Sequence, residues 1–168
     1  MAKYRIDSER SELIIDARSN VHPIEIRTAG VSGTIDVGVG AGRVDLSSPP
    51  RADFEITADL LRSGIDLYDK EIQRRIGAPK HRVIRGRIHD AREIAPARYR
   101  LSGTLSLHGV TREIEGEVDV RVHDSALEIE GSTLLDTRDY KIEPPKVLML
   151  EVHPKVKIRA VIRAVRAD

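Results

Sequence analysis

The sequence predicts an all-β fold, an antiparallel barrel of about eight strands with one short amphipathic helix packed on it. Apolar and polar residues alternate through most of the chain, which is typical of half-buried strands. Turn residues recur about every 8–12 positions. The alternation continues to both ends of the chain, which favours a closed barrel over a sandwich with protected edge strands. We therefore expect a single domain over residues 1–168.

The clearest alternation lies in residues 99–122. The first half of this segment places apolar residues or glycine at the odd positions, and the second half places them at the even positions from Ile114 onward. Residues 108–111, His-Gly-Val-Thr, separate the two halves. This pattern predicts an antiparallel hairpin whose turn uses Gly109.

Shorter alternating segments predict the remaining strands, about nine strands in all. They span residues 4–7, 13–17, 24–37 with a break at Gly30, 43–46, 54–60, 83–88, 127–135 and 156–165. Pro23 excludes an inner strand at its position, because proline has no N–H to donate. We expect loops at residues 47–50, in the Ala-Pro segment that ends at Pro96, and at Pro144-Pro145.

One stretch has helical spacing. Ile65, Tyr68, Ile72 and Ile76 lie three or four residues apart with charged residues between them. This spacing predicts an amphipathic helix that ends at Gly77. Its apolar face is interpreted as a lid on one end of the barrel, rather than as a partner-binding face.

Composition excludes several classes of protein. The 168 residues include 28 basic and 27 acidic side chains, a net charge of +1, so no basic surplus indicates nucleic-acid binding. The absence of Cys excludes disulfides, a thiol nucleophile and thiolate metal ligands. The chain has no apolar window long enough to span a membrane and no apolar segment near its N-terminus, so we expect a cytoplasmic protein.

No catalytic motif is present in the sequence, and we expect no enzyme, no cofactor and no metal site. The six histidines occur singly, and His108 is interpreted as a turn residue that bonds nearby carbonyls, with a ligand contact as the alternative. Asp136 and Asp139 form a polar group with Arg138 between them. Ion pairing explains this group more simply than acid–base catalysis does.

The predicted inner rows consist of Val, Ile, Leu, Ala and Gly, with almost no aromatic residues. A barrel of about eight strands is wide enough either to be filled by side chains or to hold one small ligand. Small aliphatic linings leave room for a long apolar guest, whereas interdigitating rows leave none, and composition does not decide between the two. The candidate tunnel-wall residues are Leu13, Ile15, Val31, Ile35, Phe54, Ile56, Leu101, Leu105, Val118, Val120, Ile129, Ile158 and Ile162. A register slip of one residue would turn these rows outward.

Several segments resemble the YceI family, polyisoprenoid-binding proteins with a lipocalin-like barrel. Residues 105–112, L-S-L-H-G-V-T-R, are similar to the family signature L-T-x-H-G-V-T-K/R. Residues 4–11 resemble its opening Y-x-I-D-x-x-H-S, with Arg10 in place of His, and residues 31–33 resemble its V-x-G strand. Residues 138–142 look like its R-x-D-F/Y-x-I element, one residue shorter before the Asp.

The resemblance implies an extended lipocalin-like barrel that holds an isoprenoid chain or a similar amphiphile. It also implies a non-catalytic role and a possible homodimer. The leading hypothesis is therefore a lipid-binding protein that sequesters or carries a polyisoprenoid in a tunnel. The alternatives are a structural or stress-related barrel with a filled interior that acts through its surface, and an enzyme that uses Asp136, Asp139 and His108.

Overall fold

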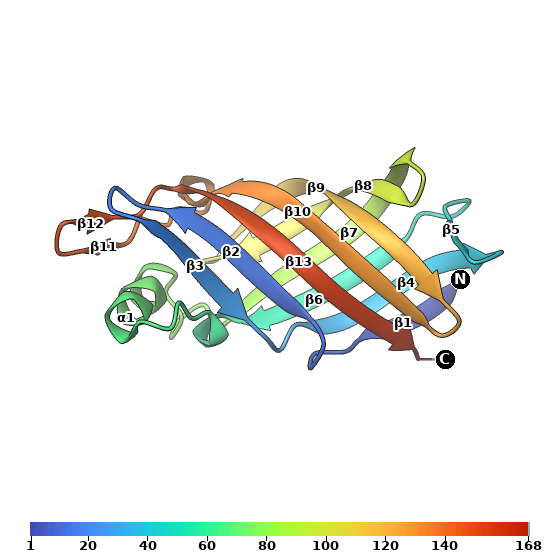
Figure 1. Ribbon diagram of the computed structural model, residues 1–168, viewed down its shortest axis with the longest axis horizontal. Helices are drawn as coiled ribbons and strands as arrows, with labels where there is room; N and C mark the ends of the chain where they lie inside the picture. The colour runs from blue at the N-terminus through green and yellow to red at the C-terminus, as the bar shows by residue number, and fades with distance from the viewer. Residues whose placement is uncertain (168) are drawn as a thin grey trace.

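A β-barrel forms the body of the molecule, with one helix and a two-stranded hairpin at one end (Figure 1). The computed structural model describes residues 1–167. The elements are β1 (Ala2–Ile6), β2 (Glu12–Arg18), β3 (Pro23–Thr28), β4 (Ser32–Gly40), β5 (Arg43–Asp45), β6 (Arg51–Thr57), η1 (Ala58–Leu60), α1 (Asp66–Arg75), β7 (Val83–Ala95), β8 (Arg98–Leu107), β9 (Val110–His123), β10 (Ala126–Asp136), η2 (Thr137–Tyr140), β11 (Lys146–Val147), β12 (Leu150–Glu151) and β13 (Lys155–Arg166).

Eight strands close the barrel in the order β1-β4-β6-β7-β8-β9-β10-β13, and β1 pairs back onto β13. One edge of β13 pairs with β10 along its length. The other edge pairs first with β2 and then with β1. The β2–β3 hairpin therefore continues the wall at the end where the helix lies, and the closed antiparallel barrel with one helix that the sequence predicts is confirmed.

Three strand boundaries differ from the prediction. The segment predicted as one strand over residues 24–37 is two strands, β3 and β4, which pair with β2 and β1 respectively. Residues 89–95, predicted as a loop, continue β7 through two register shifts against β8. Irregular pairing of this kind interrupts the alternation of side chains, so the sequence pattern does not reveal the strand. Residues 58–60, predicted as the end of a strand, form η1.

The hairpin of β8 and β9 has a shorter turn than predicted. Leu107 pairs with Val110, so only His108 and Gly109 form the turn, and both have positive φ (54° and 73°). This is the backbone that two-residue hairpins prefer, and it suits glycine much better than histidine. His108 is held there by its Nδ1, which lies 3.0 Å from the carbonyl oxygen of Tyr140 on η2.

The helix α1 lies across one end of the barrel and buries Ile72 against it (Figure 1). Asp69 is also buried, and its Oδ1 accepts hydrogen bonds from the amide (2.6 Å) and hydroxyl (2.7 Å) of Ser63. Ile65, which the helical spacing assigned to the buried face, precedes the helix and is exposed. The helix thus covers the barrel end with Tyr68, Ile72 and Ile76.

Candidate lipid-binding cavity

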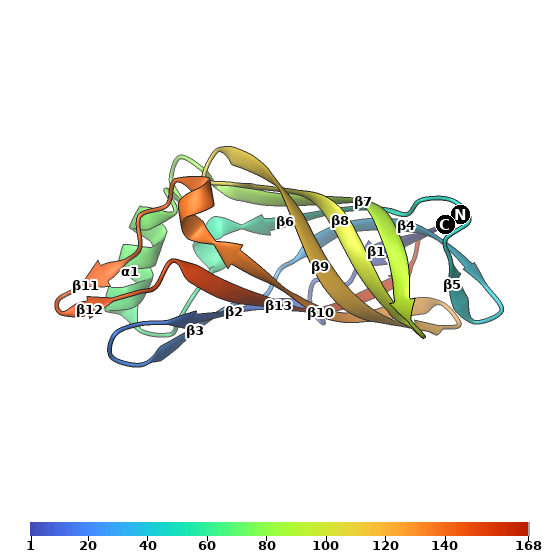
Figure 2. The same ribbon diagram turned by 90° about the horizontal axis from the view of Figure 1, so that it is seen from above.

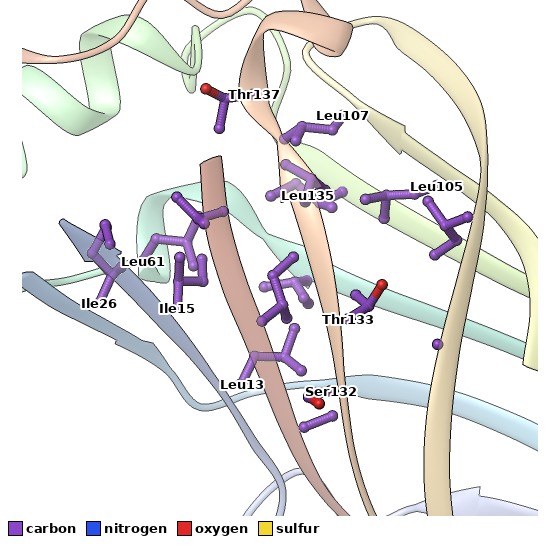
Figure 3. Close-up of a pocket in the computed structure, with 18 of the residues that line it drawn as sticks. Leu13, Ile15, Ile26, Leu61, Leu105, Leu107, Ser132, Thr133, Leu135 and Thr137 are labelled. Carbon is purple, nitrogen blue, oxygen red and sulfur yellow. The ribbon is translucent and has the colours of Figure 1, made fainter. Parts of the chain in front are cut away.

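An apolar cavity of about 260 Å³ lies inside the barrel toward the helix end (Figure 3). Its inner wall consists of aliphatic side chains from the strands, and α1 and the loops near it complete the wall. The apolar side chains that line it include Leu13, Ile15, Ala17, Ile26, Phe54, Ile56, Leu61, Ile72, Ile76, Ile84, Ile88, Leu101, Leu105, Leu107, Ile114, Val118, Leu135, Ile142, Val152, Val156, Ile158 and Ala160. We call this space the main cavity.

A second apolar cavity of about 90 Å³ lies farther along the barrel, toward the termini. Ile88, Leu101 and Val118 border both spaces and so separate them. The interior therefore contains two separate cavities. It is neither one open tunnel nor a completely filled core, the two alternatives that composition left undecided.

Eleven of the thirteen predicted tunnel-wall residues line one or both of the two spaces. Those on the main cavity are Leu13, Ile15, Phe54, Ile56, Leu101, Leu105, Val118 and Ile158. Those on the second cavity, besides Leu101 and Val118, are Ile35, Val120 and Ile129. Val31 and Ile162 line neither, because Val31 is packed in the core at 1% exposure and Ile162 packs against that core. That these residues contact a ligand stays a prediction.

Phe54 supplies the aromatic part of the main cavity wall. Its ring lies over the backbone of Gly86, its partner in the β6–β7 ladder. A Cβ atom added at Gly86 would fall 1.9 Å from Cζ of Phe54. Gly86 therefore makes the room that the ring occupies, and an aromatic ring over a glycine is a known way to fill such a gap in a sheet.

The wall opens between β9 and β10. Their ladder runs from the pair of Ala126 with His123 to the pair of Ser132 with Glu117, and the two strands then diverge (Figure 2). Outward-facing positions on both strands, Glu115 and Ser132 among them, line the main cavity, so the cavity reaches between the strands. The hydroxyl of Thr133 bridges the opening by donating a hydrogen bond to the Glu115 carbonyl. We call this gap the β9–β10 opening.

A model of the YceI-like domain matches residues 4–164. The chain belongs to this family. The resemblance that the hairpin signature suggested is therefore confirmed, together with the barrel that it implied. A comparison with curated proteins gave no match.

Several solved structures share this fold. A polyisoprenoid binding domain from Saccharophagus degradans, described as implicated in plant cell wall breakdown, is 19% identical, with 99% of this chain and 100% of that chain covered and a TM-score of 0.75. BcnA of Burkholderia cenocepacia is 13% identical, with 95% and 99% covered and a TM-score of 0.80. The Campylobacter jejuni YceI protein is 13% identical, with 82% of each chain covered and a TM-score of 0.67.

Two charged side chains that line the main cavity of this YceI-like barrel, Glu117 and Arg75, form ion pairs at its margins. Glu117, at the β9–β10 opening, accepts hydrogen bonds from Arg100 (3.0 Å) and Arg98 (2.9 Å), which hold its pKa below the ordinary value. At the helix end, Arg75 donates to Glu71 (2.7 Å) and to Glu143. These pairs leave the aliphatic side chains to form the inner surface.

The polar group on η2 also forms ion pairs. Arg138 donates to both carboxylate oxygens of Asp136, at 3.0 and 2.7 Å, and lowers the pKa of Asp136 to about 2. Asp139 lies 3.8 Å from a different guanidinium, that of Arg112. Each carboxylate has its own cationic partner, and His108 points to the Tyr140 carbonyl, so the arrangement favours ion pairing over acid–base catalysis. Within residues 1–167 no three side chains gather in a way that could hold a metal ion.

The strand pattern missed the residues that close the helix end. Ile142, Pro145 and Val152 come from the segment between η2 and β13, where side chains follow no regular period. Ile72 and Ile76 could have been included, because their helical spacing already indicated a lid on the barrel end. The polar residues at the β9–β10 opening gave no sequence signal, since they continue the outward rows of two ordinary strands.

Proposed function

We propose that this YceI-like barrel is a non-catalytic lipid-binding protein that sequesters or carries a polyisoprenoid or a similar long apolar amphiphile. The observation that carries this proposal is the main cavity, a space of about 260 Å³ lined mainly by aliphatic side chains from β2, β3, β6 to β10, β13 and α1. Membership of the YceI-like family supports it, as does the description of one structural neighbour as a polyisoprenoid binding domain.

The cavity fits hydrocarbon by its chemistry. Transfer of hydrocarbon from water to an apolar site contributes about 0.8 kcal/mol per methylene, so each isoprene unit that enters adds several kcal/mol. Two charged side chains that line it, Glu117 and Arg75, are held in ion pairs at its margins, so aliphatic side chains form most of its surface. An apolar chain without polar groups along its length is the ligand that this lining would prefer.

The volume limits how much of the ligand can enter. Cavities for drug-sized ligands measure roughly 300–1,000 Å³, so the main cavity lies just below that range. A long polyisoprenoid would therefore place one end inside and leave through an opening. The β9–β10 opening, with Glu117, Arg98 and Arg100 beside it, would leave a polar head group among charged side chains and water.

A cavity-filling substitution tests the proposal. Ala160 on β13 lines the main cavity, and its neighbour Val161 faces outward. We expect wild-type protein to bind a fifteen-carbon isoprenol in a fluorescence titration, and Ala160→Leu to lower its affinity at least about tenfold, because the added methylenes occupy ligand space. Val161→Leu, the matched control, should change the affinity less than about twofold.

Organic extracts of the native protein provide the second readout, with mass spectrometry to identify a long-chain lipid. If the extracts hold no lipid, and if the isoprenol binds neither the wild type nor either variant, the proposal fails. Equal binding by Ala160→Leu and Val161→Leu would place the ligand outside the main cavity.

The second candidate function is a structural barrel that acts through its surface. The packing of Phe54 over Gly86, which fills part of the interior, is the observation that favours it. In that case neither the wild type nor Ala160→Leu would bind the isoprenol, and no extract would contain lipid. The same two measurements therefore distinguish the candidates.

A further inference from the structure

Two loops at the helix end expose large apolar side chains. Leu148 and Met149 form the turn of the β11–β12 hairpin and are 94% and 86% exposed, and Val21 in the β2–β3 turn is 63% exposed. Both loops lie at the same end of the barrel, away from the termini (Figure 1). We call these three residues the apolar tip.

Hydrogen bonds join the two loops into one surface. The side-chain amide of Asn20 donates to the carbonyl of Met149 (2.9 Å), and its oxygen accepts from the amide of Glu151 (2.8 Å). The backbone amide of Asn20 also donates to the Glu151 carbonyl (3.2 Å). His22 Nε2 lies 3.3 Å from the hydroxyl of Tyr68 on α1, which connects the same loop to the helix. The apolar tip is thus held outward by a fixed platform.

Folding does not account for the residues of the hairpin turn. Leu148 has φ of 55°, a conformation that favours Gly, Asn or Asp over a residue with a bulky side chain. The other non-glycine residues with positive φ in residues 1–167 are Ala41, Ala97, His108 and Lys141, which are small or polar. Leu148 adopts this backbone without burying its side chain, so burial within the folded chain does not offset the backbone strain.

The apolar tip lies beside a small apolar space that borders the main cavity. Val147 and Leu150 flank the tip and line a small apolar space of about 30 Å³ between the hairpin, β3 and α1. Ile26, Ile72 and Val152 line both this space and the main cavity. An apolar chain that passed from the tip into the barrel would meet aliphatic side chains along this path.

The size and charge of the apolar tip favour a lipid bilayer over a protein partner. A stable protein interface buries roughly 800 Å² on each partner, far more than three side chains can supply. Lys146, beside the tip, lies 3.6 Å from Glu151, so its charge is paired rather than displayed for an acidic partner. No helix in residues 1–167 is long and apolar enough to cross a membrane, so such an association would be peripheral.

We propose that the apolar tip inserts into the surface of a lipid bilayer and directs the helix end of the barrel toward it, so that a lipid chain can pass between bilayer and cavity. The transfer role rests on the proposed lipid-binding function, whereas the docking itself rests on the exposed side chains. Because the insertion is apolar, it should occur on zwitterionic bilayers and should be insensitive to salt.

Co-sedimentation with phosphatidylcholine vesicles tests the docking. We expect wild-type protein to bind the vesicles with a partition coefficient that changes less than about twofold between low and high salt. The double variant Leu148→Asn with Met149→Ser should lower this coefficient at least about tenfold, since two apolar side chains are lost. Leu134→Ser is the matched control, because Leu134 is 81% exposed but lies on β10, beside the β9–β10 opening. It should change the coefficient less than about twofold.

Three further readouts make the result specific. Leu148→Asn alone should keep or raise the unfolding temperature, because Asn tolerates positive φ, so lost binding cannot be ascribed to misfolding. Titration with a fifteen-carbon isoprenol in the absence of vesicles should give the same affinity for wild type and double variant within about twofold. Sedimentation velocity should show that the double variant and the wild type have the same assembly state.

The outcomes separate the two proposals. Isoprenol binding without vesicle binding would overturn the docking and leave the lipid-binding function standing. Vesicle binding without isoprenol binding would overturn the lipid-binding function and the transfer role with it. An equal loss in Leu134→Ser, a loss of binding at high salt, or self-association that the double variant abolishes would each overturn the assignment of the apolar tip to a bilayer.

Discussion

The two ends of the barrel are built from the same alternating strands but are packed differently. At the end that holds the termini, Tyr4, Leu127 and Ala164 are almost completely buried, and the cavity there measures about 90 Å³. At the helix end the main cavity measures about 260 Å³, and α1 and irregular loops supply part of its wall. Alternation therefore determines which side chains face inward, whereas side-chain size and the covering segments determine whether the interior is filled.

This difference suggests a division of roles. The terminal end, where β1 pairs with β13 and closes the barrel, contributes the tightly packed core. The helix end encloses the larger cavity and so contributes space for a ligand at some loss of stability. Substitutions at matched positions in the two ends should therefore have unequal effects on folding.

The largest expected effect comes from a leucine truncation at the terminal end. Leu127→Ala should lower the free energy of unfolding by about 3 kcal/mol, because Leu127 is 1% exposed and borders only the smaller cavity of about 90 Å³. Leu13→Ala should lower it by about 1.5 kcal/mol, since Leu13 borders the main cavity of about 260 Å³ and so loses fewer contacts. Urea denaturation of ligand-free protein gives both values. Equal losses at the two positions would contradict the difference in packing.

Alternation in the sequence was sufficient to predict most strands of the barrel, because one face of each strand is buried, but it did not predict the short β11–β12 hairpin. It did not predict residues 89–95 of β7, where two register shifts against β8 break the period. It also could not show which end is hollow. The ring of Phe54 occupies space that Gly86 leaves, and the pairing of these two residues depends on a strand register that only the folded sheet fixes.

Gly86→Ala should lower the free energy of unfolding less than Leu127→Ala does, and it tests how Phe54 fills part of the interior. The new methyl group would collide with the Phe54 ring, so the free energy of unfolding should fall by about 2 kcal/mol. In the background of Phe54→Leu the same substitution should be tolerated, with a coupling of about 1 kcal/mol or more in a double-mutant cycle.

The matched control is Gly40→Ala, because a Cβ at Gly40 would meet no atom within 4 Å. This control should change the free energy of unfolding by less than about 0.5 kcal/mol. An additive double mutant, Gly86→Ala with Phe54→Leu, would show that the ring and the glycine are not packed as described.

The smallest expected change in the free energy of unfolding concerns the ion pairs of Glu71 on α1, at the helix end of the barrel. Hydrogen bonds from Arg74 and Arg75 lower the pKa of Glu71 from 4.5 to about 2. Because this pKa is depressed in the folded state, the stabilisation is present above pH 4.5 and is lost as the pH falls toward about 2. Glu71→Gln should therefore lower the free energy of unfolding by about 1 kcal/mol or less near neutral pH.

Urea denaturation at a series of pH values measures this difference. The gap between wild type and Glu71→Gln should close between pH 4.5 and about 2. A gap that stays constant over this window would show that the carboxylate charge does not contribute to the attachment of α1.

The candidate site was predictable to the extent that it belongs to regular strands. Leu13, Ile15 and Leu105 lie on the main cavity where their rows placed them. Val31 was assigned to the wall by the same alternation, but it lies at the junction of β3 and β4, outside both cavities. The loop residues of the helix end follow no period, so only the fold brings them to the cavity.

The central claim is that the main cavity holds an apolar chain, and a crystal structure of the protein with a fifteen-carbon isoprenol tests it most directly. We expect continuous density for the chain between Leu13, Leu105 and Leu135 in the main cavity, with the hydroxyl at one of its openings. Bound isoprenol on the outer surface of the barrel, with the main cavity unchanged and empty, would contradict it.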